Sequence, residues 1–555
     1  MGLRLGGGPA GYRDTRAGAG RAGRAVRAVW QNELGGITFE VGAGTERCFV
    51  KWAPAASGID LGAEAARLDW AVSFTRVPRL LGQGTDATGS WIVTAALPGR
   101  PAPPWPPSPG RPPARPDTAA AGVNCTLRVY SERGHALFGH DRRLGVRGGR
   151  TVMVSQASRL QNVRYDIRGP VLRRARQLEA DGHHILKLNL GNPAAFGIGA
   201  PDAVLRDVVH NIGDAQGYSD ARGIHPARLA VAQSYQRRGV PGVGPDDVFL
   251  GNGVSELIVM ALQALLDTGD EVLIPSPDYP LWTGAVGLCG GRAVHYSCDE
   301  DAGWEPDLEH VAAQISPRTR ALVIINPNNP TGAVYSRQTL LGLLDLARRH
   351  GLLVLADEIY DQILYEGAVH ECAAALAPDL LVLTMCGLSK TYRLAGFRSG
   401  WLVVSGPRHD AAEYLEGLEL LANMRLCPNV PAQYAIATAL GGGGQGIAGL
   451  LRPGGRLREQ RDHAWQKINE IPGVDCVKPL GALYLFPRLD PEVHKIADDE
   501  QMVIDLLEQQ HLLLSHGTGF NLPSADHLRL VFLAAVDVLD DAIDRLGSFL
   551  QTYRQ

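Results

Sequence analysis

The sequence has no long apolar run, no excess of charge of one sign and no regular spacing of cysteines. Its longest apolar stretches, such as residues 352–356, are far shorter than the roughly 20 residues that a bilayer-spanning helix needs. A formal net charge of -4 with 20% charged residues excludes the basic composition of a nucleic-acid or polyanion binder. The eight cysteines form no CxxC pair and no zinc-ligand spacing. We therefore expect no metal site, and reduced thiols in a cytoplasmic protein.

Composition divides the 555 residues into four parts, because a chain of this length exceeds one typical core. Residues 1–29 are rich in alanine, glycine and arginine but contain no serine, which predicts a disordered arm rather than an organellar targeting peptide. Residues 30–100 show short strands around one helix. Residues 101–150 begin with nine prolines in sixteen residues and predict a Pro-rich disordered linker. Residues 151–555 form the fourth part.

Apolar strands alternate with helical patterns in this fourth part, which predicts an α/β fold with a largely parallel sheet. The predicted helices at residues 255–266 and 339–347 carry apolar residues at intervals of three and four, so each can cover a face of the sheet. Ligands of such sheets bind at the carboxyl ends of the strands. The predicted strands are residues 248–250, 271–274, 321–325, 352–356, 380–384 and 400–404.

A glycine-rich turn follows the first of these strands, in the sequence GNGVSEL at residues 251–257. The backbone N–H groups of Gly253, Val254 and Ser255 would face a phosphate at the N-terminus of the next helix. An isolated match of this kind is more often only a tight strand-to-helix turn. The phosphate site therefore depends on residues elsewhere in the chain.

Two further turns carry polar groups at the ends of predicted strands. The prolines and glycine of NPNNPTG at residues 326–332 make a rigid turn that fixes the amide of Asn329. In DEIY at residues 357–360, the three-residue spacing lets the Asp357 carboxylate and the Tyr360 hydroxyl point into one cavity. An isolated aspartate at a strand end usually caps a helix. A buried aspartate needs a partner for its charge. A pyridinium nitrogen is such a partner and is the alternative to the role of helix cap.

An amine and a guanidinium follow the strand at residues 380–384. Lys390 ends the sequence GLSK, and Arg398 stands eight residues later. A lysine taken alone is usually a solvated surface charge. Together with the preceding turns, the pair combines a group for covalent attachment with a clamp for phosphate.

The motifs GNGVSEL, PDYPLW, NPNNPTG, DEIY, GLSKTYRLAGFR and HLRL occur in the order seen in class I aminotransferases of fold type I. From about residue 155 onward the chain resembles these enzymes, and YDIRGP, LNLGNPAAFG, GYSDARG and GALYLFP look most like the bacterial alanine (glutamate-pyruvate) aminotransferases. The resemblance implies a large, mostly parallel seven-stranded sheet domain at about residues 200–440 and a smaller α+β domain from the flanking segments. It also implies pyridoxal 5'-phosphate as cofactor and a homodimer.

The same resemblance implies roles for the residues around the cofactor. Lys390 would bind it as a Schiff base and then move a proton as general base and acid. Asp357 would face the pyridine nitrogen, while Tyr360 and Asn329 would bind the ring hydroxyl. The other implied contacts are stacking by Tyr279 and phosphate binding by Gly253, Val254, Ser255, Arg398 and, from the neighbouring subunit, Tyr218.

Substrate contacts are implied in the same way. Arg529 in HLRL would bind the α-carboxylate, with Asn329 beside it and the backbone of Gly191 closing over it. Arg168 in YDIRG would meet the side-chain carboxylate of glutamate and swing away for alanine. These residues imply transfer between L-alanine and 2-oxoglutarate, with aspartate, valine or aromatic donors as alternatives. Gly387 departs from many relatives, which carry a phosphate-binding Ser or Thr there.

Residues 30–100 resemble the N-terminal lobe of aminoglycoside 3'-phosphotransferases, with Lys51 matching the ATP lysine and Glu64 its helix partner. Phosphoryl transfer also needs a catalytic Asp and metal-binding residues on a second lobe, and no such loop precedes residue 151. We therefore interpret this part as a truncated kinase-like lobe, joined to a complete enzyme by gene fusion or a misplaced start. Aminoglycoside kinase activity and a binding module without cofactor are the rival functions.

Overall fold

The computed structural model describes residues 26–31, 37–41, 48–54, 61–71, 80–86, 89–95, 155–157, 159–160, 163, 169–442 and 446–555. The linker predicted at residues 101–150 lies outside them, as does the predicted arm up to residue 25, whereas residues 26–29 belong to a strand. The chain divides into two compact units, Met1–Leu144 and Gly145–Gln555. Among the described helices, none is long and apolar enough to cross a membrane.

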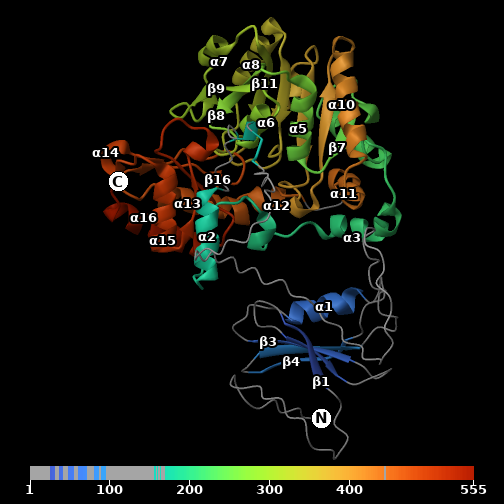
Figure 1. The fold of residues 1–555 in the computed structure, drawn as a ribbon, viewed down its shortest axis with the longest axis vertical. Coiled ribbons are helices and arrows are strands. Elements are labelled where there is room, and N and C mark those ends of the chain that lie inside the picture. The colour runs from blue at the N-terminus through green and yellow to red at the C-terminus, as the bar shows by residue number, and fades with distance from the viewer. Residues whose placement is uncertain are drawn as a thin grey trace, which may run out of the picture. The chain divides into compact units, whose positions relative to one another are not determined.

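The described residues of the N-terminal unit form a five-stranded antiparallel sheet and one helix (Figure 1). Its strands lie in the order β1-β2-β3-β5-β4, and α1 falls between β3 and β4 in sequence. A small core joins helix and sheet through Ala53, Leu61, Ala65 and Ile92. Lys51 and Glu64 form an ion pair between β3 and α1. The elements are β1 (Val26–Gln31), β2 (Ile37–Val41), β3 (Cys48–Pro54), α1 (Leu61–Ala71), β4 (Leu80–Asp86) and β5 (Gly89–Ala95).

The second unit is built on one large sheet in the order β10-β9-β8-β11-β12-β13-β14-β7. Of its seven longer strands, β14 alone is antiparallel to its neighbours, and the two-residue β10 is added at the edge. This matches the seven-stranded, mostly parallel sheet that the sequence predicts. The strands are β7 (Val248–Gly251), β8 (Glu271–Ser276), β9 (Arg292–Asp299), β10 (Glu305–Pro306), β11 (Thr319–Ile325), β12 (Leu353–Asp357), β13 (Val382–Gly387) and β14 (Gly400–Ser405).

Alternate residues of each strand face two different cores, because side chains of a strand point to opposite faces. Leu322 and Ile324 of β11 pack on one face with helices α4, α7, α8 and α11. Val323 and Ile325 pack on the other face with α5, α6 and α10. The helices are α4 (His225–Arg237), α5 (Val254–Leu265), α6 (Leu281–Leu288), α7 (Leu308–Gln314), α8 (Arg337–His350), α9 (Ala373–Leu376), α10 (Ala412–Arg425) and α11 (Val430–Leu440).

Segments from both ends of the second unit share a third core. Val171 of the first segment and Leu546 of the last belong to it, so residues on either side of the large sheet in sequence pack together. Helix α2 packs against α15 (Figure 1). The elements outside the large sheet region are α2 (Pro170–Ala180), β6 (Leu186–Lys187), α3 (Asp202–Asn211), α12 (Ala448–Leu451), α13 (Arg456–Ile468), β15 (Val474–Asp475), β16 (Tyr484–Leu485), β17 (Arg488–Leu489), α14 (Pro491–His494), α15 (Asp499–Gln510), β18 (Leu512–Leu513), β19 (Ser515–His516), β20 (Leu528–Val531) and α16 (Val536–Thr552).

Candidate active site

Five turns at one edge of the large sheet hold residues that the sequence singles out. The turns follow β7, β8, β11, β12 and β13. Because these strands run in one direction, their carboxyl ends meet at the same edge. The edge therefore gathers Gly253, Tyr279, Asn329, Asp357 and Lys390.

Lys390 lies in a cluster of polar and aromatic groups. Its Nζ donates to the carbonyl oxygen of Gly191 at 2.7 Å and lies 5.8 Å from the centre of the Tyr360 ring. Gly191 accommodates this contact because it has no side chain, since a Cβ there would lie 2.5 Å from the hydroxyl of Tyr484. The lysine, the glycine and two tyrosines thus meet at one point.

Asp357 is the last residue of β12 and is 3% exposed. Its Oδ2 accepts a hydrogen bond from Trp282 Nε1 at 3.2 Å, and its Oδ1 accepts one from the backbone of Ile359 at 3.3 Å. Burial raises the pKa of Asp357 to about 6, although these donors oppose the rise. A cationic group beside this carboxylate would favour its ionised form.

Tyr360 is paired with Tyr484, a residue that the sequence analysis did not single out. Their hydroxyl oxygens are 2.6 Å apart, and both side chains are buried. Burial raises the pKa of Tyr360 well above its ordinary value. Burial would also raise the pKa of Tyr484, but the charges of Lys390 and Arg529 lower it overall. Tyr484 lies in the segment GALYLFP, so its place in a recognised motif was the available signal.

Arg529 is buried on β20 and points at the same cluster. Its Nη1 donates to Asn329 Oδ1 at 2.9 Å, and its Nη2 donates to the carbonyl oxygen of Asn189. The guanidinium lies 4.4 Å from the centre of the Tyr484 ring and 4.5 Å from that of Phe520. The acceptors at Asn329 and Asn189 are neutral, and a guanidinium can bind a carboxylate through paired N–H groups.

Gly253 and Arg398 meet at the N-terminus of α5. Gly253 has a φ of 85°, and a Cβ there would lie 2.2 Å from Arg398 Nη2, so only glycine fits both the backbone and the neighbour. Arg398 donates to the carbonyl oxygens of Asn252 at 3.3 Å and Ala395 at 3.0 Å. The guanidinium is thereby fixed beside the first N–H groups of a helix, where anions bind.

The structure explains the glycine at position 387. Gly387 ends β13 opposite Gly400 of β14, and a Cβ at Gly387 would lie 2.8 Å from the carbonyl oxygen of Ser399. A serine or threonine would therefore collide with the neighbouring strand. Ser389 instead accepts a hydrogen bond from Arg398 Nη1 at 3.4 Å, which brings a hydroxyl beside the guanidinium.

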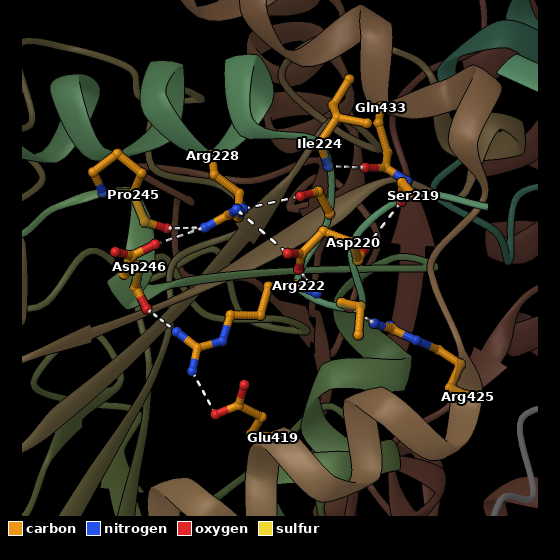
Figure 2. A network of polar contacts seen from close by, with 12 residues as sticks. Ser219, Asp220, Arg222, Ile224, Arg228, Pro245, Asp246, Glu419, Arg425 and Gln433 are labelled. Atoms are coloured by element: carbon orange, nitrogen blue, oxygen red, sulfur yellow. Dashed lines mark hydrogen bonds and ion pairs between the residues drawn. The ribbon is translucent and has the colours of Figure 1, made fainter. Parts of the chain in front are cut away.

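Tyr218 is 83% exposed, but the segment that follows it is firmly held (Figure 2). Arg222 donates to Glu419 Oε2 at 2.6 Å. The backbone N–H of Ile224 donates to Gln433 Oε1 at 2.7 Å. An exposed aromatic ring on a fixed segment is suited to contact with another molecule.

Arg425 joins this segment to the turn before α5. Its Nη2 donates to the carbonyl oxygen of Ala221 at 2.6 Å, and its Nη1 donates to Glu256 Oε2 at 2.7 Å. Glu256 in turn accepts from the backbone N–H of Asn252 at 2.7 Å. Ala221, three residues after Tyr218, and Asn252, the residue before Gly253, are thus tied to one guanidinium network.

Comparison with known proteins identifies the family. The pattern described as "Aminotransferase class I and II" matches residues 183–546.

The chain belongs to the class I and II aminotransferases.

Several relatives of this aminotransferase extend the match across the second unit. Alanine aminotransferase of Mycobacterium tuberculosis is 61% identical over 402 residues, which cover 72% of this chain and 94% of that protein. Glutamate-pyruvate aminotransferase AlaA of Escherichia coli is 57% identical over 402 residues, which cover 72% of this chain and 99% of that protein. A solved aminotransferase structure from Escherichia coli has 56% identity and a TM-score of 0.72, over 73% of this chain and all of that one.

Class I aminotransferases depend on pyridoxal phosphate, and the residues of this aminotransferase fit that group. The fit rests on the cradle at Gly253, where a Cβ would collide with Arg398, and on the charge of that arginine at a helix N-terminus. Lys390 would supply the amine for this group, and Asp357 would supply the buried carboxylate that its ring nitrogen requires.

Two predictions from the sequence receive no support from the comparisons. Arg168 lies outside the described residues, so its role stays a prediction. The match of the aminotransferase family begins at residue 183, and the likeness of residues 30–100 to a kinase lobe is not borne out by it.

Proposed function

We propose that this aminotransferase transfers the amino group between L-alanine and 2-oxoglutarate, giving pyruvate and L-glutamate. The observation that carries the proposal is 61% identity over 402 residues with proteins named alanine aminotransferase. A second group of relatives, 57% identical, is named for glutamate and pyruvate, the amino and oxo acids of the two half-reactions. Arg529 suits the α-carboxylate that all four substrates share.

Pyridoxal phosphate, when bound, supplies a ring that accepts electrons from the α-carbon as its proton leaves. Lys390 would hold the cofactor through its ε-amino group and would carry that proton as base and then as acid. Asp357, supported by Trp282, would keep the ring nitrogen protonated. Tyr360 and Asn329 would bind the ring hydroxyl, in the same cluster as the lysine and Arg529.

The remaining contacts divide between stacking, phosphate and substrate. Tyr279 would stack on the ring, and Arg398 with the N–H groups of residues 253–255 would bind the phosphate. Arg529 would grip the α-carboxylate, with Gly191 and Asn329 beside it. Arg168 would meet the second carboxylate of glutamate, and an R168A variant that keeps a normal glutamate half-reaction would refute that role.

The proposed active form is a homodimer in the cytoplasm. Tyr218, exposed on its fixed segment, would reach the phosphate of the partner subunit. Seven cysteines have free thiols in the described residues, in keeping with a reducing compartment.

A different amino donor is the second candidate. Aspartate aminotransferase of Geobacillus stearothermophilus is 29% identical over 386 residues, so the same fold and family include enzymes named for another substrate. Donors that differ by a few side-chain contacts are separated by only about 1–3 kcal/mol per contact.

Spectra of the purified full-length protein with single substrates test the proposal. Addition of L-alanine or L-glutamate should convert the absorbance of the lysine-bound cofactor to that of the amine form, and pyruvate or 2-oxoglutarate should reverse it. The K390A variant is the control, and we expect at least about a 10⁴-fold loss of turnover, because both attachment and proton transfer are lost. Conversion by aspartate or aromatic amino acids alone would overturn the alanine assignment.

A further inference from the structure

Asp278 is a fully buried carboxylate with no part in the reaction proposed above. It lies between β8 and α6, with 0% of its surface exposed. Its Oδ1 accepts from Asn521 Nδ2 at 2.6 Å, and its Oδ2 accepts from Thr283 Oγ1 at 2.8 Å. The backbone N–H of Asp278 donates to the carbonyl oxygen of Phe520 at 2.9 Å. The hydroxyl of Ser276 donates to the carbonyl oxygen of Asn521, also at 2.9 Å. Three contacts therefore tie this turn to residues 520–521.

Residues 520–521 lead directly to the substrate arginine. The ring of Phe520 lies under the guanidinium of Arg529, 4.5 Å from ring centre to Cζ. Arg529 also donates to Asn329 Oδ1 at 2.9 Å. A shift of the segment at Asn521 would move the aromatic surface on which the guanidinium lies.

The turn that begins at Asp278 leads to the cofactor carboxylate at its other end. The backbone N–H of Trp282 donates to the carbonyl oxygen of Tyr279 at 3.0 Å, which closes the turn. Trp282 Nε1 then donates to Asp357 Oδ2 at 3.2 Å. One short turn thus touches the supports of two groups, Arg529 on the substrate side and Asp357 on the cofactor side.

We propose that Asp278, through Asn521, is a positioning residue that sets the place of Arg529 relative to the cofactor. The inference rests on the proposed role of Arg529 as the group that binds the substrate carboxylate. Asp278 acts through Asn521 and Phe520 and does not itself touch the substrate. A buried hydrogen bond fixes one arrangement of the two segments, because a shift of either segment would leave a buried polar group without its partner.

The decisive variant is N521A, studied as the full-length enzyme with bound cofactor. It removes the amide that bridges to Asp278 and leaves Phe520 and Arg529 in the chain. We expect the KM for L-alanine to rise about 10-fold, equivalent to about 1.4 kcal/mol. We expect kcat to stay within about 3-fold and the affinity for pyridoxal phosphate to stay unchanged, because the lost contact supports carboxylate binding in both ground and transition states.

T283V is the matched control. It removes a hydrogen bond of similar length to the same carboxylate, but Thr283 belongs to α6 and does not reach residues 520–521. Thr283 also contacts His295 at 2.9 Å, so T283V disturbs the surroundings of Asp278 at least as much as N521A does. We expect the KM of T283V for L-alanine to stay within about 2-fold of that of the unchanged enzyme.

D278A and D278N form a second, independent pair. D278A removes the acceptor and should raise the KM like N521A, whereas D278N keeps an oxygen that can accept from Asn521 and should restore a KM within about 3-fold. R529K tests separately whether Arg529 binds the substrate α-carboxylate. If it does, the KM of R529K for L-alanine should rise at least about 100-fold.

Three outcomes would overturn the inference. In the first, the KM of N521A is unchanged while that of R529K is greatly raised. This result would contradict the role of the Asp278–Asn521 contact but not the role of Arg529. In the second, T283V raises the KM as much as N521A, or D278N fails to restore it, which means that general packing explains the effect. In the third, R529K leaves the KM unchanged, which removes the role of Arg529 together with the inference.

Discussion

Two buried carboxylates at the site, Asp278 and Asp357, differ in their neighbours. Asp357 lies beside Lys390, whose charge opposes the rise that burial causes in its pKa. Among the described residues, Asp278 has hydrogen-bond donors but no lysine or arginine as a near partner, and burial raises its pKa to about 7 against those donors. The nearby His295 does not supply a charge, because burial lowers its pKa to about 4. Of these two carboxylates, Asp278 is therefore the one whose ionisation is expected to affect folding more.

We predict that D278N changes how the stability of the protein depends on pH. The folded pKa of Asp278 lies above its ordinary value of 3.8, so the folded protein keeps a proton that the unfolded chain releases. The free energy of unfolding is then reduced as the pH rises from about 4 to 7, by up to about 1.4 kcal/mol for each unit of the shift. D278N has no such loss.

Urea unfolding of both proteins across that pH range would measure the difference. The free energy of unfolding of D278N relative to the unchanged protein should increase steadily between pH 4 and 7 and be constant above pH 8. A difference that does not vary with pH would show that Asp278 is ionised throughout.

At the scale of elements, paired strand ends position the groups proposed to bind the phosphate. Gly387 and Gly400 face each other across β13 and β14, and a Cβ on Gly400 would lie 2.9 Å from the backbone nitrogen of Val254. The two glycines therefore let the strands approach the N-terminus of α5. Arg398 lies in the connection between β13 and β14, and its guanidinium reaches Gly253.

We predict that G387S weakens cofactor binding although it adds a hydroxyl. The new Cβ would press on the carbonyl oxygen of Ser399 and separate β13 from β14. Overpacking of this kind destabilises by about 1–3 kcal/mol. The dissociation constant of pyridoxal phosphate, measured by fluorescence titration of the apoenzyme, should rise about 10-fold. The S389A variant, measured in the same way, is the comparison. A lower dissociation constant for G387S than for the unchanged enzyme would contradict the steric argument.

The predicted strands and helices coincide with observed ones where the sequence pattern is local. The stretches at residues 248–250 and 400–404 became β7 and β14, and the helix expected at residues 255–266 is α5, shifted by one residue. β9 was not predicted, although its buried and exposed residues alternate in part. Its position at the edge of the parallel sheet leaves every second side chain partly exposed, so it lacks the continuous apolar run of the inner strands.

Two separate units make up the whole molecule, and the described site residues all fall in the second. Every contact described for Lys390, Asp357 and Arg529 involves residues from 189 onward. The N-terminal unit has its own small core. We infer that transamination does not depend on it.

Removal of residues 1–150 should therefore leave kcat/KM for alanine within about 2-fold. The full-length protein, incubated with ATP and kanamycin, should give no phosphorylated antibiotic. The reason is that the catalytic residues of a second kinase lobe are missing from the sequence before residue 151. Phosphorylated kanamycin would indicate that the protein is an aminoglycoside kinase. Loss of transaminase activity in the truncated enzyme would indicate that the first unit is needed for the activity of the second.

Hybrid dimers test whether Tyr218 acts in the site of the partner subunit. In a mixture of K390A and Y218A subunits, each hybrid dimer would contain one site with both residues intact and one site with neither. Two inactive or weakened preparations should then recover activity on mixing, up to about half the specific activity per hybrid dimer. No recovery, with hybrid formation shown by mass spectrometry, would indicate that Tyr218 acts within its own subunit or not at all.

The sequence by itself determined the chemistry at each strand end. Turns rich in Gly, Pro and Asn, and the residues Asp357, Lys390 and Arg398 that follow buried strands, are local features, and their order is what identified the family. Such patterns depend on neighbours a few residues away, so they survive without knowledge of the fold.

Only the tertiary structure decided which groups support one another. Tyr484 lies against Tyr360, Trp282 binds Asp357, and Asn521 binds Asp278, although the members of each pair are far apart in sequence. The physical reason is that these contacts form when separate segments pack against the edge of the sheet. Their distances depend on the whole core and leave no periodic signal in the chain.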